Sequence, residues 1–190
     1  MKASMVDQRL EMGKLPMDFL EGLLQRYARP DERVVVGPRI GEDAAVLDMG
    51  THYLVVKSDP ITFAAEEIGW YVVHINANDV ASMGATPRWF LLTLLLPGQR
   101  STRSMVEEIF RQVDDACQAL GIVLCGGHTE VTHDLDRPIA VGIMLGEVGK
   151  GDLVRTGGAQ VGDDLILSKG IAIEGTAVLA REVGDALRNR

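Results

Sequence analysis

Residues 41–46 read Gly41-Glu42-Asp43-Ala44-Ala45-Val46, a glycine turn that leads into an apolar strand. Two later segments also place an aspartate beside an apolar element, Ser58-Asp59-Pro60 and Asn76-Ala77-Asn78-Asp79-Val80. Burying a lone carboxylate is costly unless it is paired or bound to a metal. Oxygen ligands of this kind suit Mg²⁺, which proteins hold through one or two carboxylates together with substrate phosphates. We therefore expect Asp43, Asp59 and Asp79 to belong to a magnesium–nucleotide site.

Each aspartate also has a plainer interpretation. Glu42 and Asp43 suit a solvated hairpin turn, and an aspartate before a proline, as in Asp59-Pro60, is common in turns. Asp79 is harder to explain in this way, because helical spacing places it on one face with apolar neighbours and Asn76. Asn76 either holds the carboxylate in place or contacts the cofactor itself.

The composition excludes several classes of protein. The chain has 190 residues, 46% of them hydrophobic, which fits one domain, or one domain and a fragment of another. No apolar run reaches the roughly 18 residues of a membrane span, and charges interrupt the N-terminal segment where a signal peptide needs an apolar core. A net charge of −8 argues against nucleic-acid binding, which needs a basic face. The two cysteines have no CxxC spacing, so we expect a reduced, cytoplasmic protein.

Hydrophobic periodicity predicts an α/β (α+β) fold in which helices cover one face of a mixed sheet. Strand 53–57 is expected to stop at Asp59-Pro60, because proline cannot continue a ladder. The nearly all-apolar strand over 87–96 is expected to be buried on both faces. The remaining strands are expected at 34–36, 44–48, 122–125 and 139–148, and helices at 15–28, at 68–83 before Gly84, and between the Ser101-Thr102 cap and Gly121.

The segment from Cys125 to Thr132 is expected to form a loop after a strand. Its paired glycines, Gly126 and Gly127, would let backbone N–H groups approach an anion closely. His128 and Glu130 are candidate ligands or acid–base groups, although a lone histidine of this kind is more often an ordinary loop residue. The Cys125 thiol is expected to be buried and inert.

A second glycine-containing loop is predicted between a strand over 164–168 and a helix over 176–187. A strand, a glycine loop and a helix N-terminus together suit a phosphate, although the spacing is not that of a Walker A motif. The candidate cofactor-binding residues there are Lys169, Gly170, Gly175 and Thr176.

Glycines cluster between residues 149 and 162, which indicates a connector. We expect residues 1–149 to form one domain and residues 150–190 to begin a second α/β domain. One strand and one helix cannot build a core, so the sequence is expected to be the first part of a longer protein.

Taken together, these segments resemble the superfamily of aminoimidazole ribonucleotide (AIR) synthase, which includes thiamine-monophosphate kinase, selenophosphate synthase and the hydrogenase maturation protein HypE. The resemblance runs from about residue 37 to the C-terminus, and its most specific block is Asn76 to Pro87. It implies a domain like the N-terminal domain of AIR synthase (PurM), which pairs with a second copy into a β-barrel and binds ATP through Mg²⁺ near that interface. It also implies metal ligation by the three aspartates and nucleotide contact by Gly126 and Gly127.

The departures from the family pattern concern the reaction. After the two glycines, thiamine-monophosphate kinase has an aspartate and AIR synthase a glutamate, whereas this chain has His128. Imidazole is a poor Mg²⁺ ligand, so either Glu130 takes over or one metal site is missing. The first cysteine is Cys117, whereas selenophosphate synthase uses one near its N-terminus. HypE carries a C-terminal cysteine, where this chain reads Arg188-Asn189-Arg190.

Several functions follow as hypotheses. The leading one is a HypE-like, Mg²⁺-ATP-dependent enzyme that phosphorylates or dehydrates a small oxygen-containing substrate. The alternatives are a kinase like thiamine-monophosphate kinase, a nucleotide-binding maturation or assembly protein without catalysis, and a structural dimerisation domain. A homodimer is expected because strand 87–96 is too apolar to leave one face in water. No nucleic-acid or membrane partner is expected.

Overall fold

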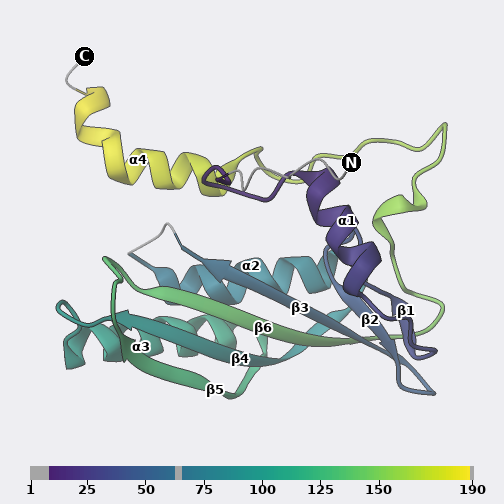
Figure 1. The fold of residues 1–190 in the computed structure, drawn as a ribbon, viewed down its shortest axis with the longest axis horizontal. Coiled ribbons are helices and arrows are strands. Elements are labelled where there is room, and N and C mark those ends of the chain that lie inside the picture. The colour runs from purple at the N-terminus through teal and green to yellow at the C-terminus, as the bar shows by residue number, and fades with distance from the viewer. Residues whose placement is uncertain (1–8, 63–65, 189–190) are drawn as a thin grey trace, which may run out of the picture.

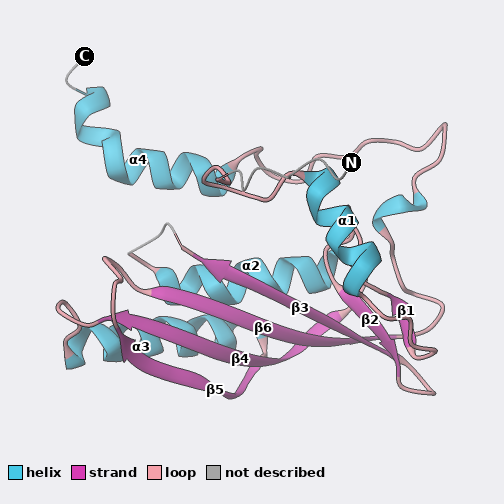
Figure 2. Cartoon of the chain, in the orientation of Figure 1, coloured by secondary structure: helices cyan, strands magenta, loops and turns pink. Residues whose placement is uncertain are grey.

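The computed structural model describes residues 9–62 and 66–188. Six strands form one sheet in the order β1-β2-β3-β6-β4-β5 (Figures 1 and 2). Only β4 and β5 are parallel neighbours; the other pairs are antiparallel. The predicted mixed α/β architecture is therefore confirmed. The strands are β1 (Val34–Val36), β2 (Ala45–Asp48), β3 (Tyr53–Ile61), β4 (Thr86–Pro97), β5 (Val123–Thr132) and β6 (Ile139–Val148).

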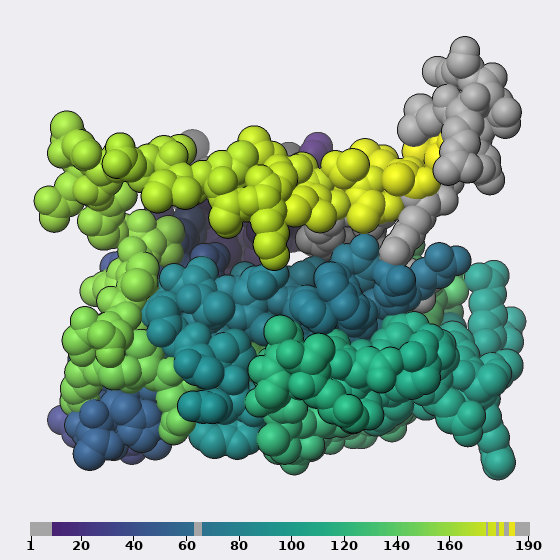
Figure 3. Space-filling model, turned by 180° about the vertical axis from the view of Figure 1, so that it is seen from behind, coloured from purple at the N-terminus to yellow at the C-terminus, as the bar shows by residue number. Residues whose placement is uncertain are grey.

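Two helices cover one face of this sheet. Helix α2 (Ile68–Ser82) lies against β3, β6 and β4, and α3 (Arg103–Leu120) lies against α2 and β5. Figure 3 shows this helical layer from behind the sheet. In the described part of the chain, α1 (Met17–Tyr27) and α4 (Ile173–Arg188) pack against no other helix or strand. A short helix, η1 (Thr156–Gly158), lies in the connector between β6 and α4.

The ends of α2 and α3 form as their sequences predict. The Thr102 side chain accepts a hydrogen bond from the backbone N–H of Met105 and so caps α3, and Gly121 ends it at φ 68°. Gly84 follows α2 at φ 78°, where a Cβ atom would also lie 2.5 Å from the carbonyl oxygen of Asp152. This close approach fixes the segment after β6 against the end of α2. Within the described ranges, no helix combines the length and apolar character needed to cross a bilayer.

The core lies between the sheet and the two helices. Along β4, Phe90, Leu92 and Leu94 are at most 3% exposed, whereas Leu91 and Leu95 are only partly buried. Strand β6 shows the same alternation. The prediction that strand 87–96 is buried on both faces is therefore wrong for this chain, because α2 and α3 cover one face only. The other face, hereafter the open face, carries apolar side chains in partial contact with solvent.

Strand β3 runs through Pro60 instead of stopping before it. Pro60 pairs with Val141 of β6, and β3 ends at Ile61. The physical reason is that β2 pairs only with Tyr53 to Val56, so the end of β3 has a sheet partner on one side only. Proline is tolerated where a strand has a partner on one side only, because fewer ladder hydrogen bonds need its missing N–H.

The glycine segment after Cys125 is also a strand, and the prediction of a loop is wrong. Gly126, Gly127 and His128 pair in parallel with Leu91, Leu92 and Thr93 of β4. The long β4 supplies hydrogen-bond partners that override the low strand propensity of glycine. Cys125 sits where the register shifts, and its residue is exposed rather than buried as predicted.

The strand predicted over 164–168 does not form. Residues 164–168 have no regular secondary structure, and Leu165 and Ile166 are 104% and 87% exposed. No described strand lies beside them to satisfy their backbone groups, which an isolated strand cannot do for itself. The helix expected at 176–187 does form, beginning three residues earlier as α4.

Candidate functional site

A lysine and an aspartate interrupt the buried face of β3. Lys57 pairs with Met144 and Asp59 with Gly142, so both point to the side of the sheet that α2 covers. The Lys57 ammonium lies 2.8 Å from Oδ2 of Asp79 and 3.3 Å from Oδ2 of Asp59. The Lys57 side chain is only 17% exposed. One cation is thus held between two carboxylates at the junction of β3 and α2.

Asp79 supplies the helical side of this cluster. Burial raises the pKa of Asp79, Lys57 counteracts it, and the charges of Asp43 and Asp59 raise it further. Burial likewise disfavours the charged form of Lys57, but Asp79 and Asp59 outweigh it, so the pKa of Lys57 lies above its ordinary value. The three aspartates predicted as metal ligands are therefore close enough to interact electrostatically.

A pocket of about 270 Å³ opens beside this cluster. Asp43 and Lys57 both line it, with Asp43 on the turn before β2 and Lys57 on β3. The pocket links the predicted turn to the ion pairs, because Lys57, which lines it, also contacts Asp59 and Asp79. Its walls come from residues 37–39, 42–45 and 56–58.

Glu42 and Asp43 have different roles in the turn. The Glu42 carboxylate is 3% exposed and pairs with Arg39, and its Oε1 also lies 3.6 Å from Nε of Arg155. Thr156 donates to Glu42 from both its backbone N–H and its hydroxyl. The hydrogen bond from Arg39 lowers the pKa of Glu42, against the effect of burial. Glu42 therefore ties the turn to the connector, while Asp43 stays exposed at the pocket.

Asn76 lies behind Asp59 and is completely buried. Its side-chain amide donates to the backbone carbonyls of Asp59 (3.2 Å) and Val72 (2.8 Å). Among the described residues, its side-chain oxygen has no hydrogen-bond partner. Of the two roles expected for Asn76, this geometry favours holding the strand that carries Asp59.

The second group of predicted residues lies elsewhere on the sheet. His128 and Glu130 are both on β5, where Nε2 of His128 is 3.1 Å from Oε2 of Glu130. Strands β6 and β4 separate β5 from β3, so three steps of about 4.8 Å place His128 roughly 14 Å from Asp59. The register also turns His128 to the open face, together with Thr93 and Val141. Within one chain, these two groups do not meet.

Gly126 and Gly127 line a separate pocket of about 350 Å³, together with His128. Gly127 has φ 146°, and a Cβ atom there would overlap the backbone of Leu92. The glycine is thus required by the close approach of β5 to β4. A contact between these glycines and a nucleotide stays a prediction.

The other predicted phosphate loop lies apart from both pockets. Lys169 and Gly170 are exposed, and Lys169 has φ 68°. Gly175 and Thr176 fall in the first turn of α4. None of these four residues lines the two pockets described above. Their role in cofactor binding also stays a prediction.

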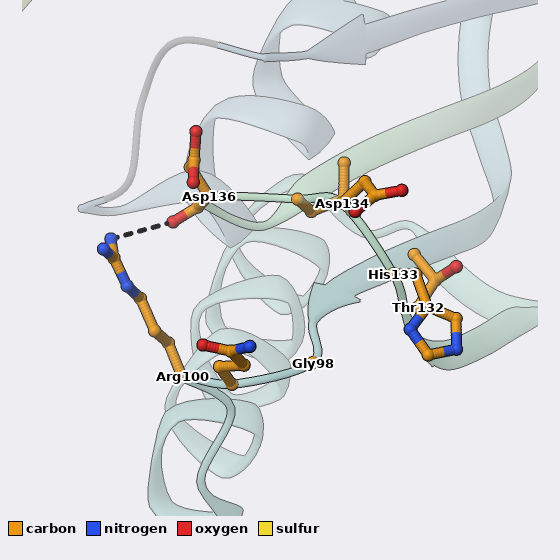
Figure 4. A pocket seen from close by; sticks show the side chains of 8 residues that line it. Gly98, Arg100, Thr132, His133, Asp134 and Asp136 are labelled. Carbon is orange, nitrogen blue, oxygen red and sulfur yellow. Dashed lines mark hydrogen bonds between the residues drawn. The ribbon is translucent and has the colours of Figure 1, made fainter.

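A third pocket, of about 450 Å³, is formed by the turns after β4 and β5 (Figure 4). Arg100 donates a hydrogen bond to the backbone carbonyl of Asp136 across it. Its side chains belong mostly to exposed turn residues, and no residue predicted for metal or cofactor binding contributes to it. The chemistry therefore points to the smaller pocket beside Lys57.

The aspartate cluster suits Mg²⁺ in the chemistry of its donors but not in their present spacing. Carboxylate oxygens are the ligands that Mg²⁺ prefers. Within the described ranges, however, no three His, Cys, Asp or Glu side chains lie close enough together to hold a metal ion. The Lys57 ammonium instead lies between Asp59 and Asp79. A metal ion in the position of the ammonium would require both carboxylates to leave Lys57.

Sequence reasoning missed Lys57 and treated Glu42 only as part of a turn. A signal for Lys57 was present in the alternation of β3, since Val55, Lys57, Asp59 and Ile61 share one face. Val55 and Ile61 are buried, so the two charged residues between them interrupt an apolar face. The tie from Glu42 to Thr156 spans 114 positions and has no local signal.

Comparison with known proteins places the chain in one protein family. The family model for the AIR synthase related protein, N-terminal domain, matches residues 41–148, more than half of the chain. A selenide, water dikinase of Dechloromonas aromatica is 30% identical over 145 residues, which cover 74% of this chain and 41% of that protein. A putative hydrogenase expression/formation protein of Methanocaldococcus jannaschii is 28% identical, with coverages of 75% and 44%. The chain thus spans less than half the length of these relatives.

Solved structures show the same fold. The thiamine-monophosphate kinase of Stenotrophomonas maltophilia is 29% identical with a TM-score of 0.52, and the match covers 77% of this chain and 46% of that one. A ThiL structure complexed with AMPPCP and TMP has a TM-score of 0.61 at 23% identity, with coverages of 77% and 44%. The family match over residues 41–148 includes the turn with Asp43, strand β3 and helix α2. This chain belongs to the AIR synthase related protein family, whose N-terminal domain it contains.

Proposed function

We propose that this chain binds Mg²⁺-ATP as part of an enzyme that phosphorylates or dehydrates a small oxygen-containing substrate. One observation carries the proposal: the charges of Asp43 and Asp59 both act on Asp79, which pairs with Lys57 beside a pocket of about 270 Å³. The names of related proteins support a phosphoryl-transfer activity, since they include a selenide, water dikinase and a thiamine-monophosphate kinase. The chain covers only part of these relatives, so the activity is proposed for the whole protein.

Each residue of the cluster has a distinct part in this proposal. Asp43, which lines the pocket, and the carboxylate oxygens of Asp59 and Asp79 that do not contact Lys57 would hold Mg²⁺. The metal would neutralise phosphate charge in the transition state, which is a main source of catalysis in phosphoryl transfer. Asn76 keeps the end of β3 in place through the carbonyl of Asp59. Glu42 holds the turn that presents Asp43, through Arg39 and Thr156.

A homodimer forms the second part of the proposal. The open face of β4 and β6 carries Leu91, Leu95 and Ile143 in partial contact with solvent, and every residue of β5 except Thr132 is exposed. Pairing this face with a second copy would bury apolar side chains and remove an exposed sheet edge. His128 cannot reach Asp59 of its own chain, so a shared site requires the second copy to supply it.

A nucleotide-binding maturation protein without turnover is the second candidate. The matching relative described as a putative hydrogenase expression/formation protein favours it, as does His128 in place of a carboxylate. Binding and turnover should be measured on the complete gene product, using a fluorescent ATP analogue and a phosphate-release assay. Mg²⁺-dependent binding with turnover supports the enzyme. Binding without turnover for every substrate tested favours the second candidate, and no binding contradicts both.

A further inference from the structure

We propose that Lys57 is a built-in cation that takes the place of one divalent metal ion between Asp59 and Asp79. The inference deepens the proposed function, because it concerns the same carboxylate cluster. It rests on the position of the ammonium, which lies 2.8 Å from Asp79 and 3.3 Å from Asp59. A metal ion bridging those two carboxylates would occupy the same space.

Mg²⁺ and the Lys57 ammonium cannot occupy the space between these two carboxylate oxygens at the same time. Mg²⁺ needs carboxylate oxygens at about 2.0–2.1 Å in near-octahedral geometry, and it keeps several water molecules. An ammonium group binds the same oxygens at hydrogen-bond distance and needs no open coordination position. The Lys57 side chain, which is only 17% exposed, already occupies the space between the two carboxylates. The lysine therefore excludes the metal by both charge and volume.

The position of Lys57 on β3 supports this interpretation. It stands on the helix-covered face of β3, opposite Met144, which is completely buried. A lysine in such a position is costly unless its charge is paired, and here it has two carboxylate partners. Asp43, whose charge also reaches Asp79, is exposed and lines the pocket. Lys57 does not pair with Asp43, so the proposed Mg²⁺-ATP site would centre on that carboxylate.

The test is metal binding without nucleotide, with Mn²⁺ as a spectroscopic probe in place of Mg²⁺. Lys57→Met removes the charge but keeps an unbranched side chain, and it leaves Asp59 and Asp79 without their cation. We expect the variant to bind Mn²⁺ at least about tenfold more tightly than the wild-type chain, because two neighbouring, partly buried carboxylates then repel each other without a cation between them. Lys150→Met is the matched control, since Lys150 pairs with Asp48 on the surface, 2.7 Å away.

Equal or weaker Mn²⁺ binding by a folded Lys57→Met variant would overturn the inference. If the variant unfolds without metal, millimolar Mn²⁺ must restore its folded circular-dichroism spectrum; failure to do so would also overturn the inference. Lys57→Arg, which keeps a cation, is expected to bind Mn²⁺ as weakly as the wild type. Because no nucleotide is present, these results stand apart from ATP binding. Loss of ATP binding alone contradicts the proposed function and not the role of Lys57.

Discussion

The buried amide of Asn76 on α2 lies directly against the backbone of Gly142 on β6, at the point where Gly142 pairs with Asp59. A Cβ atom at Gly142 would overlap the Asn76 amide and approach Phe90 to 2.8 Å. This contact couples the position of Asp59 to the packing of α2. Glycine at 142 is therefore part of the structure that positions the carboxylate cluster.

Gly142→Ala is expected to lower the free energy of unfolding by about 1–3 kcal/mol, because the added methyl group overpacks a core that has no room for it. Gly157→Ala is the matched control, since no atom lies within 4 Å of the position of its Cβ. Urea unfolding followed by circular dichroism measures both. Equal stability of the two variants would show that α2 and β6 can separate without cost.

Acid should weaken the tie between the turn of Asp43 and the connector. The pKa of Glu42 is lowered in the folded chain by Arg39, so its contribution to stability is present above its unfolded value of 4.5 and is lost as pH falls below it. Glu42→Gln should therefore cost about 1 kcal/mol at pH 7 and make stability less dependent on pH between 5 and 3. Unfolding curves at pH 7, 5, 4 and 3 provide the measurement. Parallel pH profiles of the two chains would contradict the assignment.

The two cysteines differ in a way that the sequence did not predict. Cys117 is buried, which raises the pKa of its thiol to about 11, whereas Cys125 is exposed on the edge strand. At pH 8, about one Cys117 thiol in a thousand is ionised. In a Cys125→Ser chain, Cys117 should thus react with a thiol reagent at least roughly a hundredfold more slowly than in 6 M urea. Reaction at similar rates in both conditions would mean that α3 does not shield it.

The proposed dimer can be tested on the open face. Ile143→Lys introduces a charge opposite Leu91 on that face and should convert a dimer to a monomer in sedimentation velocity at micromolar concentration. Leu120→Lys is the control, because Leu120 is 44% exposed at the end of α3, on the other side of the sheet. A wild-type chain that sediments as a monomer, or an Ile143→Lys chain that remains a dimer, would contradict the proposed interface.

The parts of the fold that the sequence predicted depend on local signals. Thr102 and Gly121 bound α3, and Gly84 ends α2, because capping acts within a few residues. The predictions of a loop at the β5 glycines and of a strand end before Pro60 were wrong, because both segments pair with strands distant in sequence. The partner is β4 for Gly127 and β6 for Pro60. The strand expected over 164–168 does not form, because no described strand pairs with this segment.

The sequence also predicted only part of the candidate site. The segments of Asp43, Asp59 and Asp79 could be selected from residue type and position, because a carboxylate beside an apolar element needs a partner. The partner itself, Lys57, was missed, although Lys57 and Asp59 interrupt an apolar face of β3 between Val55 and Ile61. The separation of His128 from the aspartates follows from the strand order, in which β5 lies three places from β3.

The central claim, that the aspartate cluster binds Mg²⁺-ATP, is tested most directly by calorimetric titration with a non-hydrolysable ATP analogue, with and without Mg²⁺. We predict Mg²⁺-dependent binding by the wild type and, for Asp79→Asn, a loss of at least about tenfold in affinity with a smaller effect on folding, because Asp59 still pairs with Lys57. The amide keeps the volume of the carboxylate but removes a ligand charge. Asp115→Asn, on the exposed face of α3, should bind as the wild type does. Unchanged affinity in folded Asp79→Asn, or wild-type binding that ignores Mg²⁺, would contradict the claim.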